Sequence, residues 1–240
     1  MSKPVQAHAQ PPRQTAAPAL RRKRVVHVVA GVLTDASGCV LLAQRPEGKH
    51  LAGGWEFPGG KLEPGETRLE ALVRELREEL GIEVAAARPL IHARHQYAER
   101  EILLDVWVVT EYRGEPASLD GQALRWCARA ELPAAKLLPA DRPIVTALRL
   151  PERLTHSEAA DYAVDEPGDS GRARLHGVSC EGREQALAAA AAGADFLVLR
   201  KALNAAELAA VCDSVPIPVF ATGLALEEAW GAGAVGVSEL

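Results

Sequence analysis

Apolar residues recur every three or four positions from residue 67 to residue 82, a pattern that predicts one amphipathic helix. Thr67 and Glu70 have the spacing of a capping box, in which each side chain bonds the backbone N–H of the other residue, so the helix is expected to begin at Thr67. The residues expected on its core-facing side are Leu69, Leu72, Val73, Leu76 and Leu80.

Short runs rich in β-branched residues predict strands on both sides of this helix. VVHVVAGVL, a Ser37-Gly38 turn and CVLLAQR are expected to form a hairpin, and WEFPGG a short strand leading into the helix. Further strands are expected in ARPLIHARHQYAEREILLDVWVVTEYRG and ALRWCAR, and a closing helix in RPIVTALRL. For residues 25–150 we therefore predict an α/β fold, an α/β/α sandwich around a mixed sheet.

The pattern changes after residue 150. Residues 151–172 are polar, with Pro, Gly and Ser, and are expected to be a linker with an uncertain helical turn. Residues 173–240 alternate β-branched runs with Ala-rich stretches, which predicts consecutive βα units and a parallel sheet. Residues 1–24 are rich in Pro, Gln and Arg and are expected to be a disordered basic tail.

Composition narrows the classes of function. The chain has 240 residues, a net charge of −5 and 48% hydrophobic residues, the values of an ordinary globular protein. An acidic balance argues against a polynucleotide partner, which would need a basic surface. The four cysteines are scattered without a C-x-x-C pair, which fits a reducing cytoplasm, and no apolar run approaches the ~18 residues of a membrane span.

Three glutamates of the predicted helix lie together on a face that is not the apolar one. Glu75, Glu78 and Glu79 are spaced i, i+3, i+4, so their charges repel. One interpretation is a solvated face on which Arg74 offsets Glu78 at i, i+4. The other is a site that holds a hard divalent cation against phosphate, favoured by the glycine-rich loop just before the helix.

The stretch 59–82 resembles the box of the Nudix hydrolases, G-x5-E-x7-R-E-U-x-E-E-x-G-U with U a bulky apolar residue. Every fixed position is filled, by Gly60, Glu66, Arg74, Glu75, Leu76, Glu78, Glu79, Gly81 and Ile82. Membership of that family implies the sandwich fold and hydrolysis of a diphosphate linkage. It also implies Mg²⁺ as cofactor, with Mn²⁺ as the alternative cation.

The features AQR, EFPGGK, YRGEP and LPADRPI extend the resemblance to the MutT branch, which hydrolyses nucleoside triphosphates, notably 8-oxo-dGTP, to the monophosphate and pyrophosphate. This implies a role in nucleotide-pool sanitation and mutation avoidance, hence DNA repair and replication. Carried over to this sequence, the metal ligands are Gly59 through its carbonyl, Glu75, Glu78, Glu79 and Asp120. Glu75 is the expected general base, with Glu79 as runner-up, while Arg74 and Glu66 support the site.

The same resemblance implies that the nucleotide contacts Arg45, Glu56, Phe57, Arg100 and Asp141. Asp141 departs from the branch, where Asn is typical. An amide both donates and accepts, so it can pair with the N7–H and O6 of 8-oxoguanine, whereas a carboxylate only accepts unless it is protonated. A charged Asp141 would suit the N1–H and N2–H edge of guanine.

Residues 173–240 resemble the second half of a thiamine phosphate synthase-like (β/α)8 barrel in HGVSCEGREQALAAAAAGADFLVL, VPIPVFATG and GAGAVGV. The first four βα units have no counterpart, so we expect no synthase activity. This piece is expected to pack on the first domain, to form a homodimer or to be a small open sheet. Two alternative functions stay open: hydrolysis of thiamine-type or pterin pyrophosphates, and a non-catalytic nucleotide-sensing module.

Overall fold

The computed structural model describes residues 24–155, 161–165, 175–200 and 204–240. The expected tail, except Arg24, and much of the expected linker lie outside these residues. The elements of the first part are β1 (Arg24–Val32), β2 (Val40–Gln44), β3 (Trp55–Glu56), β4 (Gly59–Lys61), α1 (Arg68–Leu80), β5 (Glu83–Gln96), β6 (Arg100–Arg113), β7 (Leu124–Cys127), the 3-10 turns Arg129–Ala134 and Pro139–Asp141, and α2 (Arg142–Arg149).

These strands form two sheets. The larger sheet has the order β4-β1-β6-β5 and is mixed, because β1 runs parallel to β6 while the other two pairs are antiparallel. The smaller sheet has the order β3-β2-β7 and is antiparallel. The predicted hairpin is confirmed only at its turn, where Thr34 and Val40 form an antiparallel bridge and the Leu41 N–H donates to the Leu33 carbonyl at 3.1 Å. Beyond the turn, β1 and β2 belong to different sheets.

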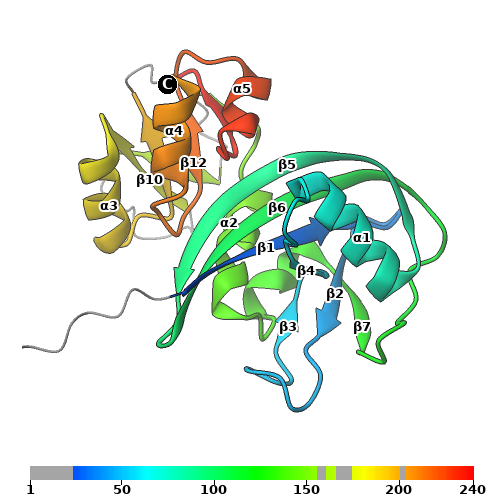
Figure 1. Ribbon diagram of the computed structural model, residues 1–240. Coiled ribbons are helices and arrows are strands. Elements are labelled where there is room, and N and C mark those ends of the chain that lie inside the picture. The colour runs from blue at the N-terminus through cyan, green and yellow to red at the C-terminus, as the bar shows by residue number, and fades with distance from the viewer. Residues whose placement is uncertain (1–23, 156–160, 166–174, 201–203) are drawn as a thin grey trace, which may run out of the picture.

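Successive residues of the larger sheet face opposite helices, as the period of a strand requires. Val29 packs in a cluster with Leu72 and Leu76 of α1, whereas Ala30 packs in a cluster with Ile144 of α2. One helix thus covers each face of the mixed sheet. The long strands β5 and β6 curve across this part of the molecule (Figure 1).

The second part is one all-parallel sheet with the order β8-β13-β12-β11-β10-β9. Its elements are β8 (Arg153–Leu154), β9 (Tyr162–Val164), β10 (Leu175–Cys180), α3 (Arg183–Ala191), β11 (Phe196–Leu199), α4 (Ala205–Cys212), β12 (Val219–Ala221), α5 (Leu226–Gly231) and β13 (Gly236–Ser238). The expected linker therefore contributes β8 and β9, which extend the sheet at both edges.

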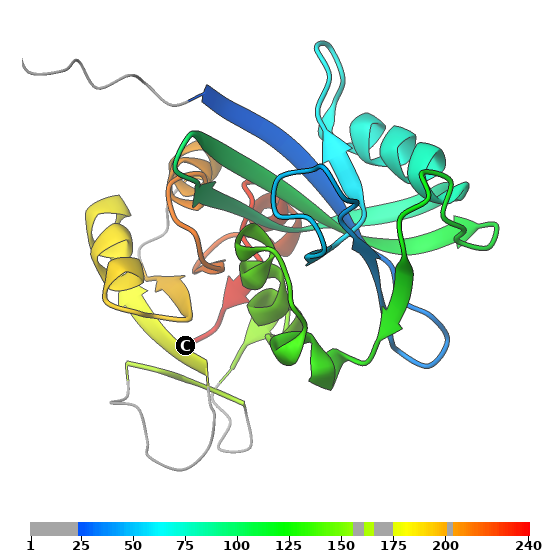
Figure 2. The ribbon, with the colours of Figure 1, turned by 90° about the horizontal axis from the view of Figure 1, so that it is seen from below.

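The two faces of the parallel sheet pack on different partners. Leu197 and Leu199 lie in a cluster with residues of α3, α4 and α5, while Phe196 and Val198 lie in a cluster with Ile144 of α2. In Figure 2, helix α2, drawn in green, lies between the mixed sheet of the first part and the parallel sheet of the second part. The face that would line the inside of a barrel is thus covered by a helix of the first part.

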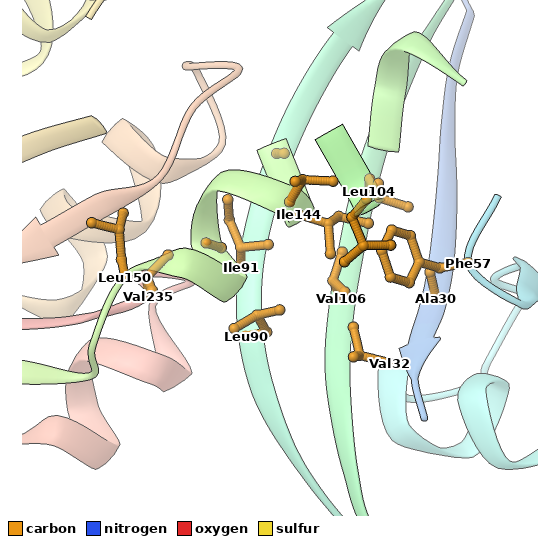
Figure 3. Packing of buried hydrophobic residues seen from close by; sticks show 14 of the residues in the cluster. Ala30, Val32, Phe57, Leu90, Ile91, Leu104, Val106, Ile144, Leu150 and Val235 are labelled. Atoms are coloured by element: carbon orange, nitrogen blue, oxygen red, sulfur yellow. The ribbon is translucent and has the colours of Figure 1, made fainter. Parts of the chain in front are cut away.

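One apolar core runs across both parts of the chain. Figure 3 shows it continuing from Leu150 and Val235, past Ile91 and Ile144, to Phe57. In the part of the chain that the structure describes, no helix is both long and apolar enough to cross a membrane.

Candidate active site

Helix α1 begins where its capping box predicts. The Thr67 hydroxyl accepts from the Glu70 N–H at 3.2 Å, the Glu70 carboxylate accepts from the Thr67 N–H at 2.8 Å, and Gly81 ends the helix in the left-handed conformation. The predicted burial of Leu69 is wrong, because the first turn is exposed and 40% of Leu69 is accessible. The residues that the helix buries are Ala71, Leu72, Leu76 and Leu80.

Arg74 binds the loop before the helix to the acidic face. Its Nε donates to Oε1 of Glu66 at 2.7 Å, and its Nη2 donates to Oε2 of Glu66 and to the Lys61 carbonyl, both at 3.0 Å. The hydrogen bond from Arg74 lowers the pKa of Glu66. Two parallel bonds between a guanidinium and a carboxylate fix direction as well as distance, so Arg74 orients the loop that enters the helix.

Glu75 and Glu78 pair with Arg74, whereas Glu79 accepts a hydrogen bond from the backbone. Arg74 Nη1 lies 3.0 Å from Oε1 of Glu75 and 3.3 Å from Oε2 of Glu78, which confirms the expected i, i+4 pair. Glu79 instead accepts from the Gly59 N–H, 3.1 Å from its Oε2. Gly60 lies directly against Glu75: a Cβ at position 60 would overlap the Glu75 carboxylate.

Glu79 sits in a strongly acidic environment. Burial raises its pKa to about 7, and the nearby charges of Glu75, Glu56 and Asp120 act in the same direction, against the hydrogen bond from Gly59. The three neighbouring carboxylates disfavour the ionisation of Glu79, so a positive charge beside it would be stabilising.

These residues line one cavity of about 680 Å³. It runs from the acidic face of α1 across β4 and β1 to the start of α2. The sequence-predicted residues that line it are Arg45, Glu56, Phe57, Gly59, Arg74, Glu75, Glu78, Glu79, Arg100, Asp120 and Asp141. Of the predicted site residues, Glu66 is not among those that line it and reaches it only through Arg74.

The end of the cavity far from α1 is built around a buried carboxyl group. Asp141 is 5% exposed, and its Oδ2 has no hydrogen-bond partner. Burial raises the pKa of Asp141 well above its ordinary value, and the charge of Glu56 adds to this, against the Phe57 N–H and Arg45. Arg45 is bonded to Glu56 at 2.5 Å, so its charge is largely directed at that neighbour.

Sequence reasoning missed several residues that line the cavity, among them Lys49, His50, Tyr97 and Gln122. The Tyr97 ring lies edge-on to His50 at 5.5 Å, and the Arg100 guanidinium lies 5.8 Å from its centre. Tyr97 follows the last residue of β5, and nothing in its local sequence pattern distinguishes it from an ordinary exposed aromatic residue. Only the folded arrangement brings it to the cavity.

The residues around Glu79 fit a hard divalent cation by donor type and charge, since all the side-chain donors are carboxylates. The side chains themselves are drawn toward Arg74 and the Gly59 N–H. Among the described residues, no three His, Cys, Asp or Glu side chains converge as a ready-made cation cage.

Comparisons with known proteins address the first part of the chain. A family model described as NUDIX domain matches residues 29–147. The CTP pyrophosphohydrolase of Escherichia coli (strain K12) is 42% identical over 124 residues, which are 52% of this chain and 91% of that protein. The 8-oxo-dGTP diphosphatase of Proteus vulgaris is 46% identical over 93 residues, 39% of this chain and 83% of that protein.

Among solved structures, the crystal structure of a MutT NUDIX hydrolase from Burkholderia pseudomallei has 28% sequence identity and a TM-score of 0.49, and covers 52% of this chain and 99% of that one. These matches cover about half of the chain, so the resemblance of residues 173–240 to thiamine phosphate synthase stays a prediction. For residues 29–147 the matched family agrees with the complete box in α1. This chain belongs to the Nudix family and is a Nudix pyrophosphohydrolase.

Proposed function

We propose that this protein hydrolyses a nucleoside triphosphate, 8-oxo-dGTP in the first place, to the monophosphate and pyrophosphate in nucleotide-pool sanitation. The observation that carries the proposal is that one cavity joins the acidic face of α1 to the buried carboxyl of Asp141. A triphosphate needs the first end and a base needs the second. Relatives with the names 8-oxo-dGTP diphosphatase and CTP pyrophosphohydrolase support this class of substrate.

Nudix hydrolases generally use divalent metal ions, typically Mg²⁺. In this chain the Gly59 carbonyl and the carboxylates of Glu75, Glu78, Glu79 and Asp120 would hold Mg²⁺, or Mn²⁺ in its place. When bound, the cation neutralises the charge that develops on the phosphate oxygens. The acidic environment that raises the pKa of Glu79 supports this assignment.

Within this scheme Glu75 takes the proton from the attacking water. Gly60 leaves space for its carboxylate, and Arg74 pairs with its Oε1 at 3.0 Å. Glu79 is the alternative base, because its carboxylate lines the same cavity next to Glu75. Arg74 and Glu66 do not touch the reacting atoms and act by orienting the loop and the glutamates.

Asp141 decides which base edge is favoured. Burial raises the pKa of Asp141 and so favours the protonated carboxyl, which has one O–H donor beside one C=O acceptor. The N7–H and O6 of 8-oxoguanine present the complementary pair, and so do the N4–H and N3 of cytosine. On the N7–O6 edge, ordinary guanine offers two acceptors and no donor for the C=O of a neutral Asp141, so only the oxidised base pairs fully there. A neutral Asp141 therefore takes the role of the amide typical of the MutT branch.

The same chemistry supports a second candidate substrate, a cytidine nucleotide. Its N3 and N4–H edge fits a neutral Asp141, and a relative with 42% identity has the name CTP pyrophosphohydrolase. The two candidates share the phosphate end of the cavity and differ only at Asp141. Both predict that dGTP is a poor substrate when the N7–O6 edge of the purine faces Asp141.

The test is a substrate panel with purified full-length protein and Mg²⁺. It compares 8-oxo-dGTP, dGTP, CTP, dCTP, thiamine diphosphate and a pterin pyrophosphate by release of the monophosphate. We expect the highest kcat/KM for 8-oxo-dGTP and lower values for the cytidine nucleotides and dGTP. A higher value for CTP than for 8-oxo-dGTP would move the assignment to the second candidate.

Three variants test the roles of the residues on the same panel. Glu75→Gln and Glu79→Gln should each lose activity by at least about tenfold, as expected for a general base or a metal ligand. Asp141→Asn should keep the preference for 8-oxo-dGTP over dGTP, because an amide presents the same donor and acceptor as a neutral carboxyl. Full activity in both Glu variants would refute the mechanism, and loss of the preference in Asp141→Asn would refute a neutral Asp141. Highest activity on the thiamine or pterin compound would favour a hydrolase of those pyrophosphates. The absence of any metal-stimulated turnover would favour a non-catalytic nucleotide-sensing module.

A further inference from the structure

The second part of the chain covers one edge of the mixed sheet that carries the active site. Strand β5 is the outer strand of the order β4-β1-β6-β5. Its His92 N–H donates to the Gly233 carbonyl at 3.0 Å, and its Arg94 N–H donates to the Val215 carbonyl at 3.2 Å. An uncovered edge strand exposes unpaired backbone groups, and these loops after α4 and α5 satisfy two of them on β5.

A buried polar chain crosses the same junction. The His92 side chain is 5% exposed, and its Nδ1 lies 3.4 Å from Oδ1 of Asp213, which follows α4. On the other side of the ring, Nε2 lies 2.8 Å from Nη1 of Arg68 and 3.3 Å from Oδ2 of Asp105. Arg68 Nε is in turn 2.7 Å from that same Asp105 oxygen.

The far end of this polar chain is the catalytic helix. Arg68 is the first residue of α1, next to the cap residue Thr67, and Asp105 belongs to β6. The charges in contact with His92 therefore come from three elements: Asp213 after α4, Asp105 on β6 and Arg68 on α1. The contact of Arg68 with His92 is a hydrogen bond, while Asp105 and Asp213 lie at ion-pair distance from the ring, and buried groups held together in this way restrict one another.

The backbone of the second part is shaped for this contact. Gly233 has a φ of +92°, and a Cβ at this position would overlap the His92 ring. A residue other than glycine would be strained in that conformation and would push the loop away from β5. The close approach of the Gly233 loop thus holds His92 between Asp213 and Arg68.

We propose that His92 is a positioning residue through which the C-terminal segment, residues 204–240, holds the start of α1 and thereby the glutamates of the active site. The segment acts as a fixed support for the catalytic helix rather than as a second active site. The inference rests on the pyrophosphohydrolase activity of the chain but not on the identity of its base.

The experiment compares Asp213→Ala with Glu239→Ala in the full-length protein. Asp213 is partly exposed, so its truncation disturbs packing little. Glu239 is a matched control because it lies in the same segment and pairs with Arg153 instead of His92. The readouts are kcat and KM with the nucleotide that the wild type hydrolyses fastest, and hydrogen exchange of the backbone amides of α1.

We expect Asp213→Ala to lower kcat by about three- to tenfold, because Asp213 reaches the active site only through His92 and Arg68. KM should stay within about twofold, because Phe57 and Asp141 lie on the α2 side of the sheet and are not part of the network. Amides of α1 should exchange faster. Glu239→Ala should match the wild type in all three measurements.

A double-mutant cycle with His92→Gln separates coupling from a local effect. If His92 carries the effect, Asp213→Ala should change kcat little further in the His92→Gln background. The proposal is overturned if Asp213→Ala equals Glu239→Ala in kcat and in α1 exchange, or if it lowers kcat equally in both backgrounds. A wild type inactive on every nucleotide would contradict the proposed substrate, while the exchange measurement would still decide the coupling.

Discussion

Glu79 is tied to the backbone of Gly59, whose N–H donates to its carboxylate at 3.1 Å. This one bond does not offset burial and three neighbouring carboxylates, so the pKa of Glu79 is raised to about 7 in the folded, metal-free protein, against an ordinary value of 4.5. The unfolded chain therefore ionises Glu79 at lower pH than the folded chain does. Between pH 4.5 and pH 7 the free energy of unfolding should fall as pH rises.

The matching prediction concerns Glu79→Gln in the presence of a chelator. An amide oxygen can still accept from Gly59 and carries no charge, so the variant should be more stable than the wild type at pH 8, by up to about 3 kcal/mol. Near pH 4 the two should be nearly equal. Urea unfolding at pH 8 and at pH 4 measures the difference in the free energy of unfolding between the variant and the wild type. The same difference at both pH values would contradict the raised pKa of Glu79.

Arg74→Lys should separate geometry from charge. A lysine keeps the positive charge but cannot form the two parallel bonds that Arg74 makes with Glu66. We expect kcat/KM to fall by about 10- to 100-fold, as for other residues that orient ligands. Arg77→Lys, on an exposed position of the same helix, is the control and should be unchanged. Equal activity of the two variants would show that the paired hydrogen bonds between Arg74 and Glu66 have no role in activity.

Gly60→Ala should impair activity more than stability. The added methyl group would overlap the Glu75 carboxylate, which is the end of a flexible side chain and can move away at little cost to folding. Displacing Glu75 should nevertheless lower kcat by at least about tenfold if Glu75 is the general base. Gly182→Ala is a matched control, because a Cβ there meets nothing within 4 Å. Thermal unfolding and initial rates of both variants, measured side by side, give the answer.

The sequence predicted best what is decided locally. The capping box of Thr67 and Glu70 and the apolar period place α1 to within a residue, because both signals lie inside the helix. Pairing of strands is not local, so the expected hairpin forms only at its turn, and β1 and β2 continue into different sheets. The strands β8 and β9 have only two and three residues, too few to show a period, and were hidden in the expected linker.

In the candidate site, too, the local features were predicted and the contacts between distant segments were not. The glutamates of α1 follow from spacing on one helix, whereas the burial of Asp141 and its closeness to Glu56 depend on two segments that are 85 positions apart in the sequence. The same holds for His92 and Asp213, which come together only because two loops cover the edge of β5. No periodicity in one strand could indicate that contact.

Phe196→Ala should destabilise the whole chain and not only its second part. The Phe196 ring is fully buried, lies edge-on to Phe220 at 5.8 Å, and belongs to the core cluster that includes Ile91 of β5 and Ile144 of α2. Removing a buried aromatic side chain typically costs about 3–5 kcal/mol. If the shared core makes both parts one cooperative unit, that loss is felt everywhere. We expect a single unfolding transition at lower denaturant concentration, with equal shifts for hydrogen exchange in α1 and in β11.

Leu187→Ala, on the exposed side of α3, is the control, and its free energy of unfolding should stay within about 0.5 kcal/mol of wild type. Two separate transitions, with only the second part shifted, would show that the catalytic part folds independently of the parallel sheet.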